Sequence, residues 1–257
     1  MNTYPLIWAH RGASAYAPEN TLEAFRLAEE MGADGVELDV QRTKDGELVV
    51  IHDETIDRVS DGHGYVKDMT LAELRRFRYN RAREGFAEKY PQAEIPTLRE
   101  VYQLLKPGKL SINVELKTGI FPYEGIEEQV LALTKEMGME DRVLYSSFGH
   151  KSLLRLKALD ENAKLGLLYS DAPVRVRHYA RKEVGVDALH PAIYHLLEEG
   201  YTEKAHKKDL KVHVWTVNEA EEIALCCAQG VDAIITNKPD FVREFLVNLS
   251  AKNTVKS

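Results

Sequence analysis

The chain has 257 residues, 44% of them hydrophobic, and a formal net charge of -7 at pH 7. This length is close to the ~250 residues of a (β/α)₈ barrel, so we expect one domain over residues 1–257. The negative charge argues against nucleic acid as a partner, but it does not exclude a local site for one small phosphate.

Apolar runs typical of strands alternate with segments of helical spacing along the chain. The predicted strands lie at residues 6–10, 35–40, 47–52, 111–116, 142–147, 165–169, 186–190, 211–217 and 232–236. The predicted helices lie at residues 21–31, 98–105, 123–137, 150–159, 174–184, 198–208, 219–229 and 239–248. The spacing of a capping box predicts three helix starts, at Asn20 with Glu23, Thr97 with Glu100, and Asn218 with Glu221.

This alternation predicts an α/β fold. If residues 47–52 form a hairpin-like extension of the second strand, the remaining strand and helix units suffice to close a TIM (β/α)₈ barrel. A doubly wound open sheet is the alternative, and it is disfavoured because no glycine-rich phosphate loop follows the first strand. We therefore predict a TIM barrel with a small insertion, residues 53–96, after the second strand.

The insertion contains a predicted short helix, capped by Thr70 and Glu73, and a basic stretch at residues 75–83. The basic stretch is compatible with a lid that meets an anionic headgroup and with an ordinary solvated surface. We favour the solvated surface, because arginines are commonly exposed without a partner.

Charged residues interrupt two predicted buried strands: Glu37 and Asp39 in GVELDV, and Glu115 and Lys117 in INVELK. Residues two apart on a strand share a face, so each pair is expected to point into one space. Burying a charge without a partner is costly, so three converging carboxylates are expected to hold a cation. Oxygen ligands without cysteine suit calcium, magnesium or manganese. The alternative is an ion-pair network with Lys117 and Arg11, which leaves one carboxylate unbalanced.

Six stretches between Ile7 and Phe245 form a recognisable set of motifs: HRGASAYAPENTLEAF, GADGVELDVQRTKDGELVVIHDETIDR, NVELK, SSF, VWTVN and GVDAIITNKPD. In this order they resemble the glycerophosphodiester phosphodiesterase family. The resemblance implies a TIM-barrel hydrolase that uses a divalent cation to cleave glycerophosphodiesters to glycerol 3-phosphate and an alcohol. It also implies that Glu37, Asp39 and Glu115 are the metal ligands, in agreement with the strand-face argument.

His10 and His52 match the catalytic pair of this family. Phosphodiester cleavage needs a base to deprotonate the attacking oxygen and an acid to protonate the departing alkoxide, and imidazole serves either role near neutral pH. The family also suggests that the attacking oxygen is the glycerol 2-hydroxyl of the substrate, which forms a cyclic phosphate that water then opens. The other histidines, including His190, are expected to pack or to lie in loops.

Four further residues are predicted to bind the substrate. Arg11 offers planar, bidentate donors to phosphoryl oxygens, and Lys117 supplies a compact charge, although it could simply pair with Glu115. Phe148 and Trp215 could pack against the glycerol carbons, with core packing as the alternative. At the last strand Asn237 stands where the family often has aspartate, so a possible carboxylate is missing there.

Two alternatives to a glycerophosphodiesterase remain. A phospholipase D-type enzyme acting on lysophospholipids would need an apolar groove, for which residues 53–96 are rather polar. A non-catalytic phosphate-binding barrel would not need the histidine pair. The N-terminal residues lead into an apolar strand without an export leader, and no segment approaches the ~20 apolar residues of a membrane span. We therefore expect a cytoplasmic protein with a small-molecule substrate and no transmembrane segment.

Overall fold

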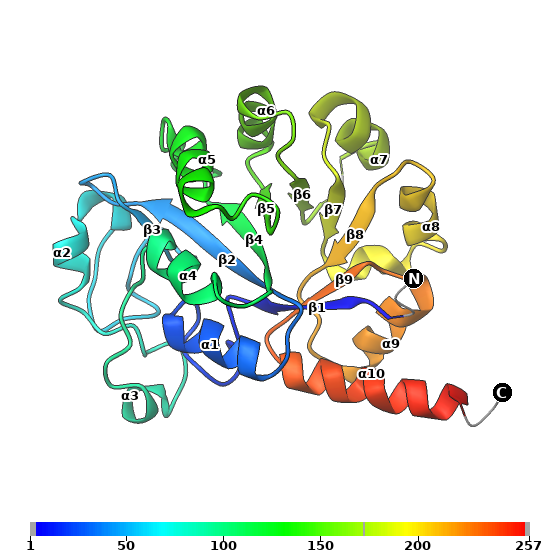
Figure 1. The fold of residues 1–257 in the computed structure, drawn as a ribbon, viewed down its shortest axis with the longest axis horizontal. Helices are drawn as coiled ribbons and strands as arrows, with labels where there is room; N and C mark the ends of the chain where they lie inside the picture. Colours follow the sequence, from blue (N-terminus) through cyan, green and yellow to red (C-terminus); the bar gives the residue numbers. More distant parts are fainter. Residues whose placement is uncertain (1–3, 172, 255–257) are drawn as a thin grey trace.

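The computed structural model describes residues 4–171 and 173–254. In this part of the chain eight parallel strands close into a ring in the order β1, β2, β4, β5, β6, β7, β8, β9 (Figure 1). Their bounds are Leu6–His10, Gly35–Arg42, Ser111–Leu116, Val143–Ser147, Leu165–Tyr169, Ala188–Pro191, Lys211–Val214 and Ala233–Thr236. The predicted TIM barrel is confirmed.

One short strand lies outside the ring. β3 (Leu48–Val50) runs antiparallel to the end of β2, with Val50 opposite Val40 and Leu48 opposite Arg42. This arrangement confirms the predicted hairpin-like extension of the second strand.

Helices surround the barrel (Figure 1). They are α1 (Leu22–Glu30), α4 (Leu98–Leu105), α5 (Ile126–Met137), α6 (His150–Leu159), α7 (Val176–His178), α8 (Tyr201–His206), α9 (Ala220–Gln229) and α10 (Pro239–Thr254). Their apolar faces meet the outward-facing side chains of the strands, and Leu38 on β2, Phe25 on α1 and Tyr102 on α4 belong to one buried apolar core. Within residues 4–171 and 173–254, no helix combines the length and hydropathy needed to cross a bilayer.

Several predicted element bounds differ from the structure on the β6 to β8 side. The expected helix 174–184 is a single α-helical turn, α7, followed by a π-helix at Tyr179–Val184. The expected helix 198–208 begins only at Tyr201, because Gly200 adopts the left-handed conformation before it and a 3₁₀-helix occupies Ile193–Leu197. The expected strand 211–217 ends at Val214.

Two of the predicted capping boxes are confirmed. At α4 the Thr97 hydroxyl accepts the Glu100 N–H, and Glu100 accepts the Thr97 N–H at 2.8 Å. Thr70 and Glu73 form the same reciprocal pair at α2 (Leu71–Leu74). In both boxes two of the free amides at the helix start find acceptors.

The other two predicted caps are one residue too early. Thr21, not Asn20, caps α1, and Glu219, not Asn218, caps α9. Both asparagines instead use their side chains at the end of the barrel: Asn20 binds Asp39, and Asn218 binds the end of β9. Adjacent polar residues satisfy the same spacing rule, so spacing alone does not choose between them.

The segment between β3 and α4 contains a 3₁₀-helix at Val66–Asp68, α2 and α3 (Phe86–Lys89), and it lies beside β3, away from the ring (Figure 1). It folds around a small apolar core that includes Ile56, Leu74 and Ile95. In its basic stretch Arg75 pairs with Glu100 at 2.6 Å and Arg78 pairs with Glu94 at 2.8 Å. Such surface pairs support the solvated-surface interpretation.

Aspartates fix the opposite, N-terminal end of the barrel. Three of them precede strands, and each accepts the main-chain N–H of a residue on a neighbouring strand: Asp34 from Ile7 at 2.9 Å, Asp187 from Leu165 at 2.8 Å and Asp232 from Val212 at 2.8 Å. A cavity of about 770 Å³, lined partly by Leu6, Trp8 and Lys211, opens at this end. Because TIM-barrel enzymes place their chemistry at the other end, we assign these contacts to stability.

Candidate active site

The predicted charged residues converge at the C-terminal ends of three neighbouring strands, β1, β2 and β4. The strand register sets His10 opposite Glu37 and Asp39 opposite Glu115. Neighbouring strands lie ~4.8 Å apart, so side chains on the same face at these positions meet inside the barrel. The predicted convergence of the three carboxylates is thereby confirmed.

Glu37, Asp39 and Glu115 form a buried acidic cluster. Their exposed fractions are 4%, 1% and 7%, and one carboxylate oxygen from each lies within 4.8 Å of the other two. Within the described residues the Oδ1 atom of Asp39 makes no hydrogen bond. Buried oxygens at this spacing, one of them without a donor, fit a hard divalent cation such as calcium or magnesium.

The three carboxyl groups oppose one another's ionisation. Burial, Asp39 and Glu115 raise the pKa of Glu37 well above its usual range, and burial and Asp39 raise the pKa of Glu115 against the effect of Lys117. Burial would also raise the pKa of Asp39, but nearby cations, above all Arg11, hold it below its usual range. A cation bound among the three would favour their ionised forms.

Two basic side chains contact the cluster. The Nζ of Lys117 lies 2.9 Å from Glu115 Oε1 and 3.8 Å from Asp39 Oδ1. Arg11 donates its main-chain N–H to Glu37 Oε2 at 3.0 Å, and its Nε lies 3.4 Å from Asp39 Oδ2. The ion-pair network weighed as an alternative therefore exists, but it sets two cations against three acids. It gives Asp39 Oδ1 an ion pair with Lys117 at 3.8 Å but no hydrogen bond.

The turn after β1 presents Arg11 to the cluster. Arg11 and Gly12 both adopt the left-handed conformation, with φ of 56° and 78°. A Cβ atom at Gly12 would lie 2.7 Å from the backbone carbonyl carbon of Ala24 in α1. Close packing against α1 is therefore sufficient to require this glycine.

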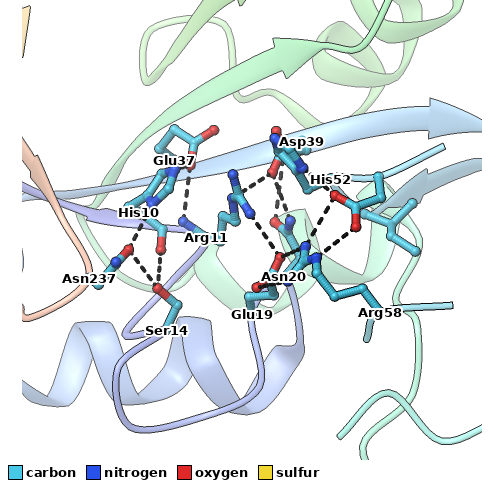
Figure 2. Close-up of polar contacts among 12 residues, drawn as sticks. His10, Arg11, Ser14, Glu19, Asn20, Glu37, Asp39, His52, Arg58 and Asn237 are labelled. Carbon is cyan, nitrogen blue, oxygen red and sulfur yellow. Dashed lines mark hydrogen bonds and ion pairs between the residues drawn. The ribbon is translucent and has the colours of Figure 1, made fainter. Parts of the chain in front are cut away.

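His10 occupies one side of the cluster (Figure 2). Its Nε2 lies 3.9 Å from Glu37 Oε2, and its Nδ1 lies 2.7 Å from Oδ1 of Asn237, which also accepts a hydrogen bond from Ser14 at 2.9 Å. Burial and the neighbouring Arg11 lower the pKa of His10 to about 4. The imidazole is therefore neutral near pH 7.

His52 follows β3 and has a carboxylate partner. Its Nδ1 lies 2.6 Å from Asp53 Oδ1, while the Gln41 amide donates to the main-chain oxygens of His52 and Asp53 at 3.0 and 2.6 Å. Hydrogen bonds from His52 and Arg58 hold the pKa of Asp53 well below its usual range. Because an ionised carboxylate only accepts, Nδ1 donates, and Nε2 of the neutral ring is free to accept a proton.

Four polar residues around these groups had no predicted role at the site: Glu19, Asn20, Asp53 and Arg58. Asn20 donates to Asp39 at 2.8 Å, and Glu19 accepts from Arg11 at 2.9 Å (Figure 2). All four lie in the stretches APENT and HDETIDR. Their presence in the stretches that carry the family resemblance was the available signal, but their contacts cross loops, where no periodicity applies.

Phe148 and Trp215 lie at the ends of β5 and β8. Their ring centroids are 5.6 Å apart, with the rings at 84° in an edge-to-face arrangement. Trp215 is fixed by a 2.8 Å hydrogen bond from its Nε1 to the main-chain oxygen of His190, whereas Phe148 is 41% exposed. That exposure disfavours core packing for Phe148 and leaves its ring available at the barrel mouth.

Comparison with known proteins agrees with this geometry. A sequence model described as the glycerophosphoryl diester phosphodiesterase family matches residues 10–241. A glycerophosphodiester phosphodiesterase of Caldanaerobacter subterraneus subsp. tengcongensis is 44% identical over 247 residues, 96% of this chain and 98% of that protein.

Solved structures show the same similarity. A phosphodiesterase from Oleispira antarctica, in complex with the product sn-glycerol-3-phosphate, aligns with a TM-score of 0.82 at 29% identity, over 95% of this chain and 97% of that one. A glycerophosphodiester phosphodiesterase from Agrobacterium tumefaciens aligns with a TM-score of 0.81 at 26% identity, over 93% and 98%. The chain belongs to the glycerophosphoryl diester phosphodiesterase family and is a phosphoric diester hydrolase.

Proposed function

We propose that this protein hydrolyses glycerophosphodiesters to glycerol 3-phosphate and an alcohol, with His10 and His52 as the general acid and base. The observation behind this proposal is that both imidazoles lie near one acidic cluster (Figure 2): His10 Nε2 lies 3.9 Å from Glu37 Oε2, and His52 is among the neighbouring groups that lower the pKa of Asp39. The similar Oleispira antarctica enzyme, which holds sn-glycerol-3-phosphate, supports this choice of substrate.

The two imidazoles meet the proton requirements of the reaction. One accepts the proton of the attacking oxygen as the new P–O bond forms, and the other donates a proton to the departing alkoxide as the old P–O bond breaks. Each ring is held through Nδ1, His10 by Asn237 and His52 by Asp53, which leaves each Nε2 for proton transfer.

Glu37, Asp39 and Glu115 would hold the divalent cation, which supplies positive charge beside the phosphoryl oxygens. Together with Arg11 and Lys117, such a site has a net charge of about +1, which suits a phosphodiester monoanion. We assign Arg11 and Lys117 to the phosphate, and Phe148 and Trp215 to the glycerol carbons. The substrate is a small soluble molecule, in keeping with the predicted cytoplasmic location. Residues 1–257 form one catalytic domain, which includes the 53–96 insertion.

We further propose that the attacking oxygen is the glycerol 2-hydroxyl of the substrate, so that the first product is a cyclic phosphate. Glycerophosphodiesters that lack this hydroxyl test the proposal. The 2-deoxy compounds should turn over at least ~100-fold more slowly, since an oriented intramolecular nucleophile is lost. Equal rates would instead indicate direct attack by water.

The activity is tested with metal-stripped protein and a panel of substrates. Glycerophosphocholine, glycerophosphoethanolamine, glycerophosphoglycerol, glycerophosphoinositol and lysophosphatidylcholine are each supplied with calcium, magnesium or manganese while release of the phosphomonoester is followed. The proposal expects glycerol 3-phosphate from at least one of the first four substrates, and only with metal. Preferred cleavage of lysophosphatidylcholine would indicate a phospholipase D-type enzyme, and binding without cleavage under all conditions would indicate a phosphate-binding barrel.

A further inference from the structure

Arg58 lies in the insertion, between two loops of the candidate site (Figure 2). Its Nε and Nη2 donate to the two carboxylate oxygens of Asp53 at 2.7 and 3.2 Å. Its Nη1 and Nη2 donate to the two carboxylate oxygens of Glu19 at 2.8 and 2.7 Å. One planar guanidinium thus binds two carboxylates in a bidentate manner, a geometry that a lysine ammonium cannot reproduce.

The first of these carboxylates, that of Asp53, binds a proposed catalytic imidazole. Asp53 Oδ1 accepts from His52 Nδ1 at 2.6 Å and from Arg58 at 3.2 Å. With both oxygens of Asp53 bound to Arg58, the carboxylate cannot rotate away from the ring. This contact selects the Nδ1–H tautomer of His52 and fixes the direction of Nε2.

The second carboxylate, that of Glu19, binds the proposed phosphate-binding arginine. Glu19 Oε1 accepts from Arg58 at 2.7 Å and from Arg11 at 2.9 Å. The Nε of Arg11 in turn lies 3.4 Å from Asp39. The side chain of Arg58 is 44% exposed and that of Glu19 only 14%, so the contacts run from the insertion surface into the site.

We propose that Arg58 is a positioning residue of the hydrolase, acting through Asp53 and Glu19. Through Asp53 it fixes the imidazole of His52, and through Glu19 it fixes the guanidinium of Arg11. An isolated surface ion pair contributes little to stability. This guanidinium, however, constrains two carboxylates, and each of them binds a residue of the site. The insertion is thereby a part of the active site. This inference rests on the catalytic role proposed for His52.

Kinetics of three arginine variants test the proposal. Arg58→Gln should lower kcat/KM by about 10- to 100-fold, because small misplacements of catalytic groups have effects of this size. Arg58→Lys, which keeps the charge but not the fork, should recover only part of the loss. Arg78→Gln is the matched control, since Arg78 lies in the same insertion but pairs with Glu94. Arg58→Gln within twofold of Arg78→Gln would overturn the proposal.

A spectroscopic measurement separates positioning from a purely structural effect. In protein labelled with ¹⁵N-histidine at pH 8, the His52 signals, identified by their loss in His52→Asn, should show the Nδ1–H tautomer. The same signals in Arg58→Gln should show a mixture of tautomers, while Arg78→Gln leaves them unchanged. An unchanged His52 spectrum in Arg58→Gln would contradict the proposed action through Asp53.

Combined variants identify the route and separate this inference from the proposed function. If Arg58 acts partly through Asp53, the loss in Arg58→Gln/Asp53→Asn is smaller than the product of the single losses, and losses that multiply in full overturn that route. Full activity in His52→Asn refutes the catalytic role of His52 in the proposed function, on which this inference rests. An inactive His52→Asn together with a normal Arg58→Gln refutes only the role of Arg58.

Discussion

The Nδ1 atom of His10 lies 2.7 Å from Oδ1 of Asn237, whereas Nδ1 of His52 lies 2.6 Å from a carboxylate oxygen of Asp53. The two imidazoles of the candidate site therefore have partners of different charge. A neutral amide orients a ring without stabilising its protonated form as strongly as a carboxylate does. The low pKa of His10, about 4, is consistent with this difference, because the ring is buried beside Arg11 and has no hydrogen bond to a carboxylate.

Asn237→Leu tests whether the amide orients His10. Leucine has a similar volume but no acceptor for Nδ1, so the ring is expected to lose its fixed orientation and kcat to fall by about 10- to 100-fold. Asn237→Asp keeps an acceptor at this position and should retain more activity than the leucine variant. The measurement is steady-state hydrolysis of the preferred glycerophosphodiester. Equal activity in the leucine variant and the unaltered protein would argue against an orienting role.

Glu37→Gln tests the metal site without relying on activity. Burial, Asp39 and Glu115 raise the pKa of Glu37, so its ionised form destabilises the metal-free protein, and the variant should melt at the same or a higher temperature in chelator. Addition of the activating cation should raise the melting temperature of the unaltered protein. At a cation concentration of 100 times Kd, binding stabilises the folded state by about 2.7 kcal/mol. The variant should need more cation for the same shift. Identical shifts would mean that the ion binds elsewhere.

Period-two alternation was enough to predict the acidic cluster. In β2, Val36, Leu38 and Val40 belong to the main core, so the charged residues between them must point into the barrel. A carboxylate in such a run has no structural reason to be there, which makes the signal strong. The closed ring then determines which strands are neighbours, and it sets Asp39 opposite Glu115.

Contacts between loops could not be predicted in this way. Glu19 and Arg58 are 39 positions apart, and neither lies in a helix or strand whose period fixes its direction. The helix start near Asn20 shows a similar limit. Asn20 and Thr21 are both good capping residues, and a tertiary contact decided between them, because the Asn20 side chain binds Asp39.

Asp187→Ala tests the assignment of the N-terminal end to stability. The variant leaves the main-chain N–H of Leu165 without its 2.8 Å acceptor, at a cost of about 1 kcal/mol. Asp187→Asn keeps an acceptor oxygen and should lose less. Urea unfolding measures both, and kcat per folded molecule should stay unchanged because the site lies at the opposite end of the barrel. A fall in kcat at unchanged stability would contradict this division.

A buried histidine pair inside the barrel makes a prediction about acid stability. His213 Nδ1 lies 2.9 Å from His190 Nε2, and both side chains are buried. Burial lowers the pKa of His190 to about 3, and burial together with His190 lowers that of His213 well below its usual value. The packing role expected for His190 agrees with its position, and both rings stay neutral in the folded protein over most of the acid range.

The sign of the effect follows from proton binding by the unfolded chain. Below the ordinary histidine pKa of 6.5 the unfolded state takes up two protons that the folded state refuses, so stability falls from about pH 6.5 towards pH 3. Each histidine contributes about 1.4 kcal/mol per pH unit well below its unfolded pKa. Urea unfolding measures this effect. Between pH 5.5 and 4.5 the free energy of unfolding of His190→Gln/His213→Gln should therefore fall by about 2.7 kcal/mol less than that of the unaltered protein. Comparing these two losses cancels the other titrating groups, so equal losses would show that the pair is protonated in the folded barrel.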